Sequence, residues 1–397
     1  MFSSPAPEDL GFMAEALHVA ARIPRRPWPN PPVGALVVRD GRVVGRGAHQ
    51  GSGLAHAEVL ALEEAGALAQ GATLYCTLEP CNHSGRTPPC APRVAGSGVR
   101  RLVVGVADPS PAVARGGLEI VASAGIEVTI GVLARDALDL IWPFAATRAF
   151  ERPFVLLKTA TSLDGRFGPG ARPSGTRGVP IYLTGEKARR DVHRFRCWAD
   201  VVLVGEGTLA ADRPRLNGRL ARDQDDCPAA DPTPGYVDTD LSYAGTWPAE
   251  RPLVFVGRSR ADAAARERVE RRGATVVVCD ERDGRVAPES LLDQVFNGIG
   301  RAIMIEGGPT LATAFLQAGL VDRWVRYTAP LLLGDGPAWP VWSPRTDVQA
   351  GQRFHLTRVE QIGKDVKAVF DRLPFDEVVR DLTTRRVRPR GGNEGGA

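Results

Sequence analysis

The sequence lacks several features that would point away from a globular enzyme. No run of about 18 or more apolar residues is present, so we expect no membrane-spanning helix and no membrane partner. The first ten residues carry Pro, Glu and Asp instead of a basic stretch followed by an apolar one, which argues against a secretory signal and favours a cytoplasmic protein. Six cysteines in 397 residues are too few for a disulfide-stapled scaffold. With 50 basic and 46 acidic residues, charge gives no reason to expect a nucleic-acid partner.

The length and the hydrophobic pattern predict two domains. The first part alternates strands and helices, starting with a hairpin over 33–38 and 42–47 that turns at Asp40-Gly41, followed by a helix over 57–65. Near Phe150 the alternation begins again without repeating the first part. We therefore predict two different α/β domains, over 1–150 and 151–374.

Two polar stretches are predicted to lie outside the domain cores. The stretch 221–250 is rich in Asp, Pro, Gly and Thr and is predicted to be a surface insertion in the second domain. Residues 375–397 combine arginines with glycines and are predicted to form a disordered basic tail.

Three residues in the first domain suit a hydrolytic zinc site. Such a site uses three nitrogen or sulfur ligands and keeps a fourth position for water, and His56, Cys81 and Cys90 supply that set. Glu58 follows His56 by two residues at the start of the predicted helix, where it can act as the catalytic proton carrier. Zinc deaminases combine His-x-Glu with Pro-Cys-x-x-Cys, but here eight residues separate the two cysteines. The spacing alone leaves open a closed site with His83 as fourth ligand, or two unrelated buried cysteines.

In the second domain, two glycine-rich turns follow apolar strands. Val204–Thr208 follows one strand, and Ile305–Thr310 follows another and opens a helix. Glycine at a strand end allows close approach of a ligand, and a helix N-terminus favours phosphate. The turns predict a nucleotide or a phosphorylated substrate, although neither is a complete Gly-x-Gly-x-x-Gly fingerprint.

These motifs and their flanks resemble the bifunctional deaminase–reductase family of riboflavin biosynthesis over roughly residues 8 to 370. The longer cysteine spacing is that family's own variant. The resemblance implies an N-terminal three-layer domain similar to cytidine deaminase and a C-terminal α/β domain similar to dihydrofolate reductase. The matching segments are Pro29–Gly34, His56–Val59, Thr77–Cys90, Leu157–Arg166, Thr184–Gly185, Ala188–Arg189, His193–Arg196, Asp212–Asn217 and Glu306–Thr310.

The resemblance implies a two-step reaction with Zn²⁺ and NADPH as cofactors. A phosphorylated aminopyrimidine, the phosphoribosylamino-pyrimidinone of the pathway, would be hydrolytically deaminated, and its ribosyl chain would then be reduced to a ribityl chain. A homo-oligomer, dimer or tetramer, is also expected. The implied substrate-binding residues are Asn30, His49, Lys158, Thr184, Arg196, Leu216, Arg219 and Glu306. The implied cofactor-binding residues are Thr161, Tyr182, Thr208, Asp212, Gly308, Pro309 and Thr310.

Without the resemblance, these residues have simpler interpretations. Asn30 fits a turn, His49 fits the surface, and any single arginine fits a solvated charge. The residues also do not distinguish NADPH from NADH.

The second domain departs from the family pattern at several positions. Pro180 stands where the family has serine, Tyr182 and Leu183 replace Trp-Ile, and Arg213 replaces the second acid of Asp-Asp-Pro. The family's next strand has its nearest match at 235–238, inside the predicted insertion. These departures keep open an alternative: a specialised paralogue with an active deaminase and an altered or weak reductase.

Two alternatives from other functional classes fit the sequence less well. A base-editing enzyme for polynucleotides would need a basic, aromatic-bearing groove, which 1–150 does not show. A non-catalytic zinc scaffold would leave Glu58 without a purpose.

Overall fold

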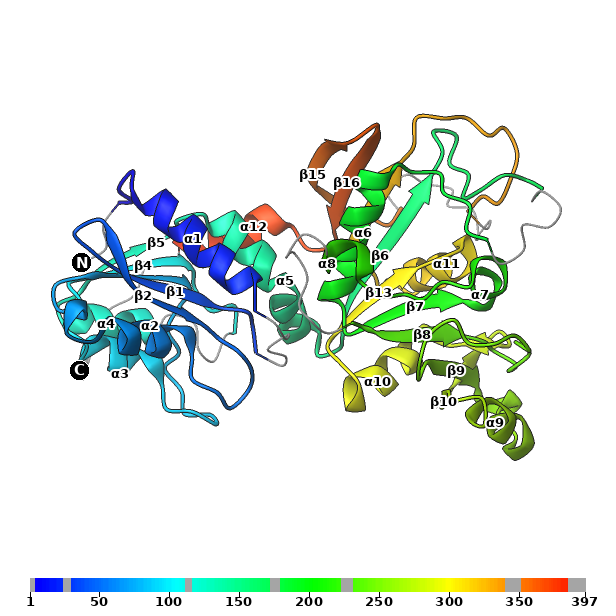
Figure 1. Ribbon diagram of the computed structural model, residues 1–397, viewed down its shortest axis with the longest axis horizontal. Helices are drawn as coiled ribbons and strands as arrows, with labels where there is room; N and C mark the ends of the chain where they lie inside the picture. Colours follow the sequence, from blue (N-terminus) through cyan, green and yellow to red (C-terminus); the bar gives the residue numbers. More distant parts are fainter. Residues whose placement is uncertain are drawn as a thin grey trace, which may run out of the picture. The chain divides into compact units, whose positions relative to one another are not determined.

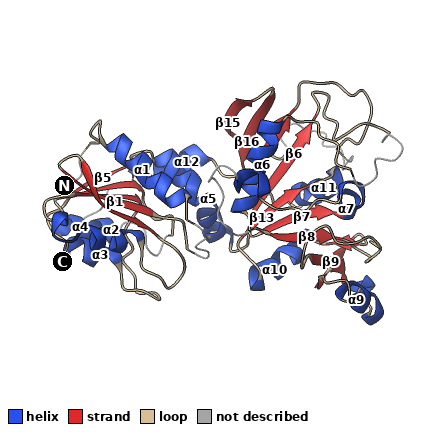
Figure 2. Cartoon of the chain, in the orientation of Figure 1, coloured by secondary structure: helices blue, strands red, loops and turns tan. Residues whose placement is uncertain are grey.

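The computed structural model describes residues 4–23, 30–110, 116–171, 179–222, 231–339 and 351–384. The chain forms two compact units (Figure 1), the first built from Met1–Ala145 with Asp376–Ala397 and the second from Ala146–Phe375. The division between Ala145 and Ala146 falls within helix α5 (Ala134–Phe150). Each unit has its own sheet (Figure 2) and is described separately below.

The first unit is a three-layer α/β domain around a five-stranded sheet of order β2-β1-β3-β4-β5. Strands β1 and β2 form the predicted hairpin, β3 runs antiparallel to β1, and β4 and β5 continue parallel to β3. Helices α1, α5 and α12 cover one face of the sheet, and α2, α3 and α4 cover the other (Figure 1). The strands are β1 (Gly34–Arg39), β2 (Arg42–Ala48), β3 (Thr73–Leu78), β4 (Arg101–Val106) and β5 (Glu127–Ile130). The helices are α1 (Asp9–Ala21), α2 (Ala57–Ala65), the short 3₁₀ turn Gly66–Ala69, α3 (Cys90–Ala95), α4 (Gly116–Ser123) and α12 (Phe375–Thr384).

Helix α2 packs directly on the backbone of β2. A Cβ atom added at Gly45 would lie 2.1 Å from the carbonyl oxygen of Ala61, and one added at Gly47 would lie 2.0 Å from that of Ala57. Ala57, Ala61 and Ala65 are all buried and recur every four residues, so small side chains on the helix face glycines on the strand. This contact fixes the start of α2, where His56 is the N-cap residue.

The second unit contains a nine-stranded sheet of order β10-β9-β8-β7-β13-β6-β14-β16-β15. The seven strands from β10 to β14 are parallel, and β16 and β15 add an antiparallel edge. The strands are β6 (Phe154–Thr161), β7 (Val201–Gly205), β8 (Thr233–Val237), β9 (Leu253–Gly257), β10 (Thr275–Cys279), β13 (Ala302–Glu306), β14 (Arg323–Thr328), β15 (His355–Ile362) and β16 (Asp365–Asp371), with a separate hairpin of β11 (Glu281–Arg282) and β12 (Arg285–Val286). The helices are α6 (Glu186–Trp198), α7 (Glu206–Asp212), α8 (Arg219–Arg222), α9 (Ala263–Glu270), α10 (Pro288–Gly298) and α11 (Pro309–Gln317), with a 3₁₀ turn at Arg258–Arg260.

In the second unit, successive side chains of a strand point alternately into the hydrophobic core and to a polar face of the sheet. Leu157 of β6 and Ile305 of β13 pack into a core with Leu291 of α10 and Phe315 of α11. The next residue of each strand, Lys158 and Glu306, therefore points to the opposite face of the sheet. Because Glu306 and Lys158 are partners in the parallel register, their side chains lie next to each other on that face.

The expected surface insertion at 221–250 is wrong in part, because it contains an interior strand of the sheet. Strand β8 pairs in parallel with β7 on one side and β9 on the other. Tyr236 is fully buried and donates its hydroxyl to the carbonyl of Pro214 at 2.9 Å. Gly235 leaves room for Leu203, whose side chain would lie 2.4 Å from a Cβ there. A five-residue strand containing Pro and Gly gives little apolar signal, and the surrounding polar residues concealed it. Residues 223–230 lie outside the described residues.

The predicted tail at 375–397 also needs correction, because its first part is helix α12, Phe375–Thr384. The carbonyl of Leu382 accepts a hydrogen bond from the backbone of Ala107 at 3.4 Å, which ties the helix to the first unit. Val378, Val379 and Leu382 recur at helical spacing, and this short apolar stripe was overlooked among the arginines. Residues 385–397 lie outside the described residues.

Of the helices that the structure describes, none is long and apolar enough to cross a membrane.

We expect Gly47→Ala to destabilise the first unit and to displace the start of α2. A methyl group 2.0 Å from the Ala57 carbonyl oxygen forces the helix away from β2, and overpacking of this kind costs about 1–3 kcal/mol. Urea unfolding and bound-zinc content after purification measure the two effects. Gly11→Ala is the matched control, because a Cβ at Gly11 of α1 meets nothing within 4 Å. An unfolding midpoint for Gly47→Ala equal to that of the control would contradict the close packing.

Candidate active sites

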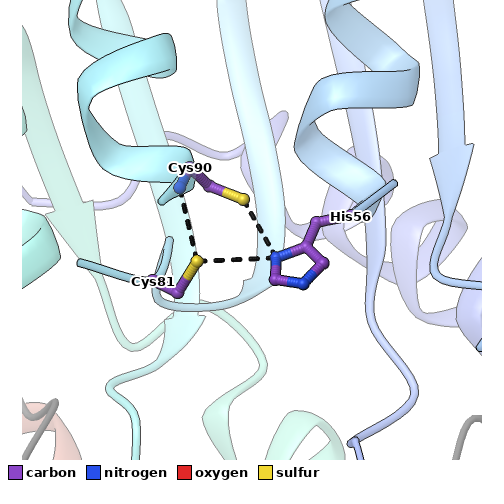
Figure 3. A group of neighbouring side chains, drawn as sticks. All are labelled: His56, Cys81 and Cys90. Atoms are coloured by element: carbon purple, nitrogen blue, oxygen red, sulfur yellow. Dashed lines mark hydrogen bonds between the residues drawn. The ribbon is translucent and has the colours of Figure 1, made fainter. Parts of the chain in front are cut away.

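The structure brings His56, Cys81 and Cys90 together (Figure 3). They lie on the side of the sheet that helices α2 and α3 cover (Figure 1). His56 caps α2, Cys81 lies in the loop after β3, and Cys90 begins α3. The Nδ1 atom of His56 lies 3.0 Å from the sulfur of Cys90 and 3.5 Å from that of Cys81. All three ligand atoms lie within 4.8 Å of one another, a spacing that a single metal ion can bridge.

The chemistry of these donors fits zinc. Two thiolates and one imidazole form one of the ligand sets used in catalytic zinc sites, which keep a fourth position open. The pKa of Cys81 is lowered to about 4, first because the Cys90 thiol donates a hydrogen bond to it, and further by His56. The same bond raises the pKa of Cys90. Metal ligation requires thiolates, so zinc binding would release the remaining thiol proton. His83 is exposed and lies outside the cluster, so in the described part of the chain it is not a fourth ligand.

The loop that carries Cys81 is held in place by Glu79, a buried residue that the sequence did not single out. One carboxylate oxygen of Glu79 accepts the backbone N–H groups of Gly117 at 3.0 Å and Leu118 at 3.3 Å. The other accepts the N–H of Asp108 at 3.0 Å. A Cβ at Gly117 would lie 1.8 Å from the carbonyl oxygen of Pro80, so the start of α4 packs on the loop itself. The signal available in the sequence was the position of Glu79 two residues before Cys81.

Glu58 lies in the first turn of α2 and is only 3% exposed. Burial raises the pKa of its carboxyl group to about 7, while His56 opposes the rise. A carboxyl group with a pKa near the working pH can both accept and donate a proton during a reaction. Its surroundings therefore suit the role predicted for it.

Asn30 and His49 lie beside the metal cluster. The ring of His49 is 4.9 Å from that of His56, edge to face. Its Nδ1 contacts the carbonyl of Ala55 at 3.2 Å, so Nδ1 carries the hydrogen and Nε2 accepts from the Asn30 amide at 2.9 Å. Burial lowers the pKa of His49, which keeps it neutral. With 2% of its surface exposed, His49 is not the surface residue that the simpler interpretation suggested.

The second unit has a cavity of about 590 Å³ at the carboxyl ends of β6, β7 and β13. Ligands of open parallel sheets commonly bind at this edge. The predicted site residues Thr161, Pro309 and Thr310 are not among the residues that line the cavity. The predicted residues that line it are Lys158, Thr184, Arg196, Leu216, Arg219, Glu306, Tyr182, Thr208, Asp212 and Gly308.

A buried group of three charged side chains, Arg196, Glu306 and Lys158, lines this cavity. Arg196 of α6 donates to both carboxylate oxygens of Glu306, one of them at 3.0 Å, and the ammonium group of Lys158 lies 4.0 Å from the same carboxylate. Burial would raise the pKa of Glu306, but Arg196 and then Lys158 hold it below its usual value, so Glu306 is charged. Burial lowers the pKa of Lys158, and the nearby Arg196 lowers it further.

His193 also lines the cavity, although the sequence assigned no role to it. Its Nδ1 accepts the backbone N–H of Leu220 at 3.3 Å, and its other ring nitrogen lies 3.4 Å from Arg196. Burial, with Arg196 and Arg219 nearby, lowers its pKa to about 3, so it is neutral. The available signal was its position three residues before Arg196, one helical turn away.

Three positions at which the sequence is expected to depart from the family pattern lie in the same cavity. Pro180, Tyr182 and Arg213 all contribute to its lining. The ring of Tyr182 lies 4.6 Å from the guanidinium of Arg189, which donates to the carbonyl of Thr184 at 2.8 Å. Arg213 ends α7 in the left-handed conformation, with a φ of 44°.

Both halves of the chain match known protein families. Residues 7–106 match the cytidine and deoxycytidylate deaminase zinc-binding region, and residues 153–368 match the RibD C-terminal domain. Riboflavin biosynthesis protein RibD of Escherichia coli is 36% identical over 90% of this chain and 98% of its own length. That of Aquifex aeolicus is 33% identical over 92% of this chain and 98% of its own length. This chain belongs to the RibD family.

Solved structures of RibD proteins share the fold over nearly the whole chain. Acinetobacter baumannii RibD is 34% identical with a TM-score of 0.70, covering 92% of this chain and 98% of its own. A deaminase/reductase from Thermotoga maritima is 29% identical with a TM-score of 0.72, covering 91% of this chain and 98% of its own. The expected fold class, a cytidine-deaminase-like domain followed by a reductase domain of the RibD type, is confirmed. As a RibD protein, the chain is a zinc-dependent deaminase and an NADPH-dependent reductase.

We expect Glu306→Gln to destabilise the second unit by about 3–5 kcal/mol at neutral pH, because it leaves Arg196 buried without its counter-charge. A carboxylate whose folded pKa is depressed stabilises the fold above its unfolded pKa, near 4.5, and loses this contribution as pH falls through the folded value. The difference between wild type and variant should therefore be constant above about pH 5 and shrink below it.

Urea unfolding of wild type and Glu306→Gln at a series of pH values measures this difference. The control is Glu267→Gln, which removes a carboxylate from an ion pair whose side chains are 70% exposed, and should change stability by less than about 1 kcal/mol. A wild type–variant difference that grows as pH falls would contradict a charged Glu306 in the folded state.

Proposed function

We propose that this RibD protein deaminates the phosphoribosylamino-pyrimidinone of riboflavin biosynthesis and then reduces its ribosyl chain to a ribityl chain. The observation that carries the first step is the cluster of His56, Cys81 and Cys90 beside the buried Glu58. The second step is supported by the cationic cavity at the carboxyl ends of the parallel strands. We assign the deaminase to residues 1–150 and the reductase to residues 151–374.

In the deaminase site, His56, Cys81 and Cys90 would hold zinc. Bound zinc would act as a Lewis acid that makes water nucleophilic near neutral pH. Glu58 takes a proton from the attacking water and passes it to the pyrimidine ring nitrogen, and a second proton transfer releases the amino group as ammonia. Asn30 and His49 offer an amide and a neutral imidazole next to the cluster, which suit the ring and the sugar-phosphate side of the substrate.

In the reductase cavity, NADPH would supply the hydride that is delivered to C1′ of the ribosyl group. Lys158, Arg196 and Glu306 present a fixed set of charges that can hold the hydroxyl and phosphate groups of the substrate. The substrate also has Thr184, Leu216 and Arg219 as candidate contacts. The backbone N–H of Gly308 is anchored to the Thr208 hydroxyl at 3.0 Å, which fixes the glycine turn before α11.

We assign the cofactor to the side of the cavity that holds Thr208, Asp212, Tyr182 and Gly308. Pro309 and Thr310 begin α11 directly behind Gly308, so the helix N-terminus favours a phosphate group there. Thr161 is the last residue of β6, and its buried hydroxyl has no hydrogen-bond partner in the described part of the chain. Thr161 lies on the Leu157 face of β6, opposite Lys158, and does not line the cavity, so its assignment as a cofactor contact rests on the family resemblance.

We further propose that the protein works in the cytoplasm as a homo-oligomer, a dimer or tetramer. Cys81 and Cys90 are free thiols, the state that metal ligation requires. Leu356 and Val359 are each 57% exposed on β15, the edge strand of the large sheet, and such an edge suits association with a second copy.

The relatives reported above give no support to a specialised paralogue. Arg213 and Pro180 nevertheless line the reductase cavity, so the two activities have to be measured separately.

We expect Glu58→Gln to lower the rate of ammonia release by about 10²–10⁴-fold, because general acid–base catalysis contributes this much. Zinc content should not change, and NADPH oxidation with the deaminated intermediate should remain at the wild-type rate. Glu63→Gln on the same helix is the control, since Glu63 is exposed and paired with Arg93 at 3.3 Å. Ammonia release by Glu58→Gln within twofold of this control would remove Glu58 from the mechanism.

We expect Lys158→Met to act on the second step alone. Loss of a charged hydrogen-bond donor costs about 1.5–3 kcal/mol, so kcat/KM for NADPH oxidation should fall roughly 10–100-fold. Ammonia release should stay at the wild-type rate, because the zinc cluster belongs to the other unit. Both rates are followed in one assay with the amino substrate. Ammonia release without any NADPH oxidation in the wild-type protein would instead favour the paralogue.

A further inference from the structure

We propose that Thr87 is a positioning residue for the zinc site: its hydroxyl holds the His56 ring so that Nδ1 faces the metal. The inference rests on the zinc site of the proposed function. The observation behind it is a contact of 3.2 Å between the Thr87 hydroxyl oxygen and Nε2 of His56. Thr87 lies in the loop between the two cysteine ligands, three residues before Cys90.

The two ring nitrogens of His56 have different surroundings. Nδ1 faces both sulfurs, at 3.0 Å and 3.5 Å, and is the atom that would bind the metal. A metal-bound imidazole is neutral and carries its hydrogen on the other nitrogen. Nε2 is therefore the donor, and the Thr87 hydroxyl oxygen is its acceptor. This acceptor selects the tautomer with a free lone pair on Nδ1 and fixes the angle of the ring.

The backbone around Thr87 is built to hold this hydroxyl in place. Pro88 and Pro89 follow it directly, and a residue before proline is restricted to an extended conformation. Pro89 is the N-cap of α3, with φ of −65°, so a stiff segment joins Thr87 to the ligand Cys90. On the other side, the N–H of Gly85 donates to the Thr87 carbonyl at 3.2 Å, and the N–H of Ala91 donates to the Cys81 carbonyl at 3.0 Å. The hydrogen bond between Ala91 and Cys81 thus joins the two ends of the loop, and Thr87 within the loop contacts His56.

This arrangement gives the unusual cysteine spacing a physical reason. In Cys-x-x-Cys, two intervening residues complete the turn between the ligands and cannot fold back over a third ligand. Eight residues separate Cys81 from Cys90, which is enough chain to reach the far side of the imidazole. The longer loop therefore supplies the hydrogen-bond acceptor for the histidine ligand as well as the two thiolates.

The test is the zinc affinity of the full-length protein, measured by competition with a chromophoric chelator without any substrate. Loss of a partner to a metal-bound histidine typically weakens metal binding about 10–100-fold, so we expect this loss for Thr87→Val, which keeps the shape but removes the hydroxyl. Thr87→Ser keeps the hydroxyl and should bind zinc within about threefold of wild type. Ser84→Ala, which removes an exposed hydroxyl from the same loop, is the control and should match wild type.

A second readout separates positioning from general loosening of the loop. The ¹⁵N shifts of the His56 ring report which nitrogen carries the hydrogen, and in zinc-loaded wild type and Thr87→Ser this should be Nε2, with the Nε2 hydrogen protected from exchange with water. In Thr87→Val that protection should be lost. If Thr87→Val does not fold, Thr87→Ala replaces it with the same expectations.

The outcomes are distinct. Wild-type affinity in both hydroxyl-free variants would overturn the inference while leaving the zinc site intact. An equal loss in Thr87→Ser and Thr87→Val would also overturn it, since the hydroxyl would then not matter. Failure of the wild-type protein to bind zinc would overturn the proposed deaminase itself.

Discussion

The burial of charge is the constraint on which both active sites depend. In the first unit, the sulfurs of Cys81 and Cys90 lie beside the His56 ring, and burial raises the pKa of the nearby Glu58 carboxyl. In the second unit, Glu306 is buried and is neutralised by Arg196 and Lys158. In each site, charged groups are buried away from water and paired with a partner. Because the local dielectric constant is low there, their electrostatic interactions with a substrate are strong.

Rigid backbone contacts hold these charges in position. Gly45 and Gly47 bring α2 onto β2 and so set His56 and Glu58, while Gly117 and Glu79 hold the loop of Cys81 against α4. In the second unit, the parallel register places Lys158 beside Glu306 at the edge of the sheet. The supporting residues make no contact with a reacting atom, but a shift of any of them moves a residue that does.

Membership of the RibD family accounts for both active sites. Arg213 and Tyr182 lie among the residues that line the reductase site, together with the arginines expected from the family. Arg213 adds to the positive charge of Arg215 and Arg219, which makes the cavity more attractive to phosphate groups. This charge therefore bears on the affinity of the cavity for phosphorylated ligands.

The sequence by itself determined what depends on residue type and short spacing. It predicted the hairpin before α2 and the helix over 57–65, because each is encoded within a few neighbouring residues. The three metal ligands lie far apart in the sequence, and the spacing of the cysteines became decisive only together with the family resemblance. It gave only a weak match for β8, at 235–238, because this short strand lies in polar surroundings and is held by its neighbours β7 and β9. It did not predict α12, whose place is fixed by its packing on the first unit. Glu79, His193 and Thr87 lie in segments that match the family, but the sequence assigned no role to them, because their roles arise from contacts that only the fold makes. Hydrogen bonds and burial between distant segments exist only in the folded chain, so the tertiary structure alone decided which polar side chains support the sites.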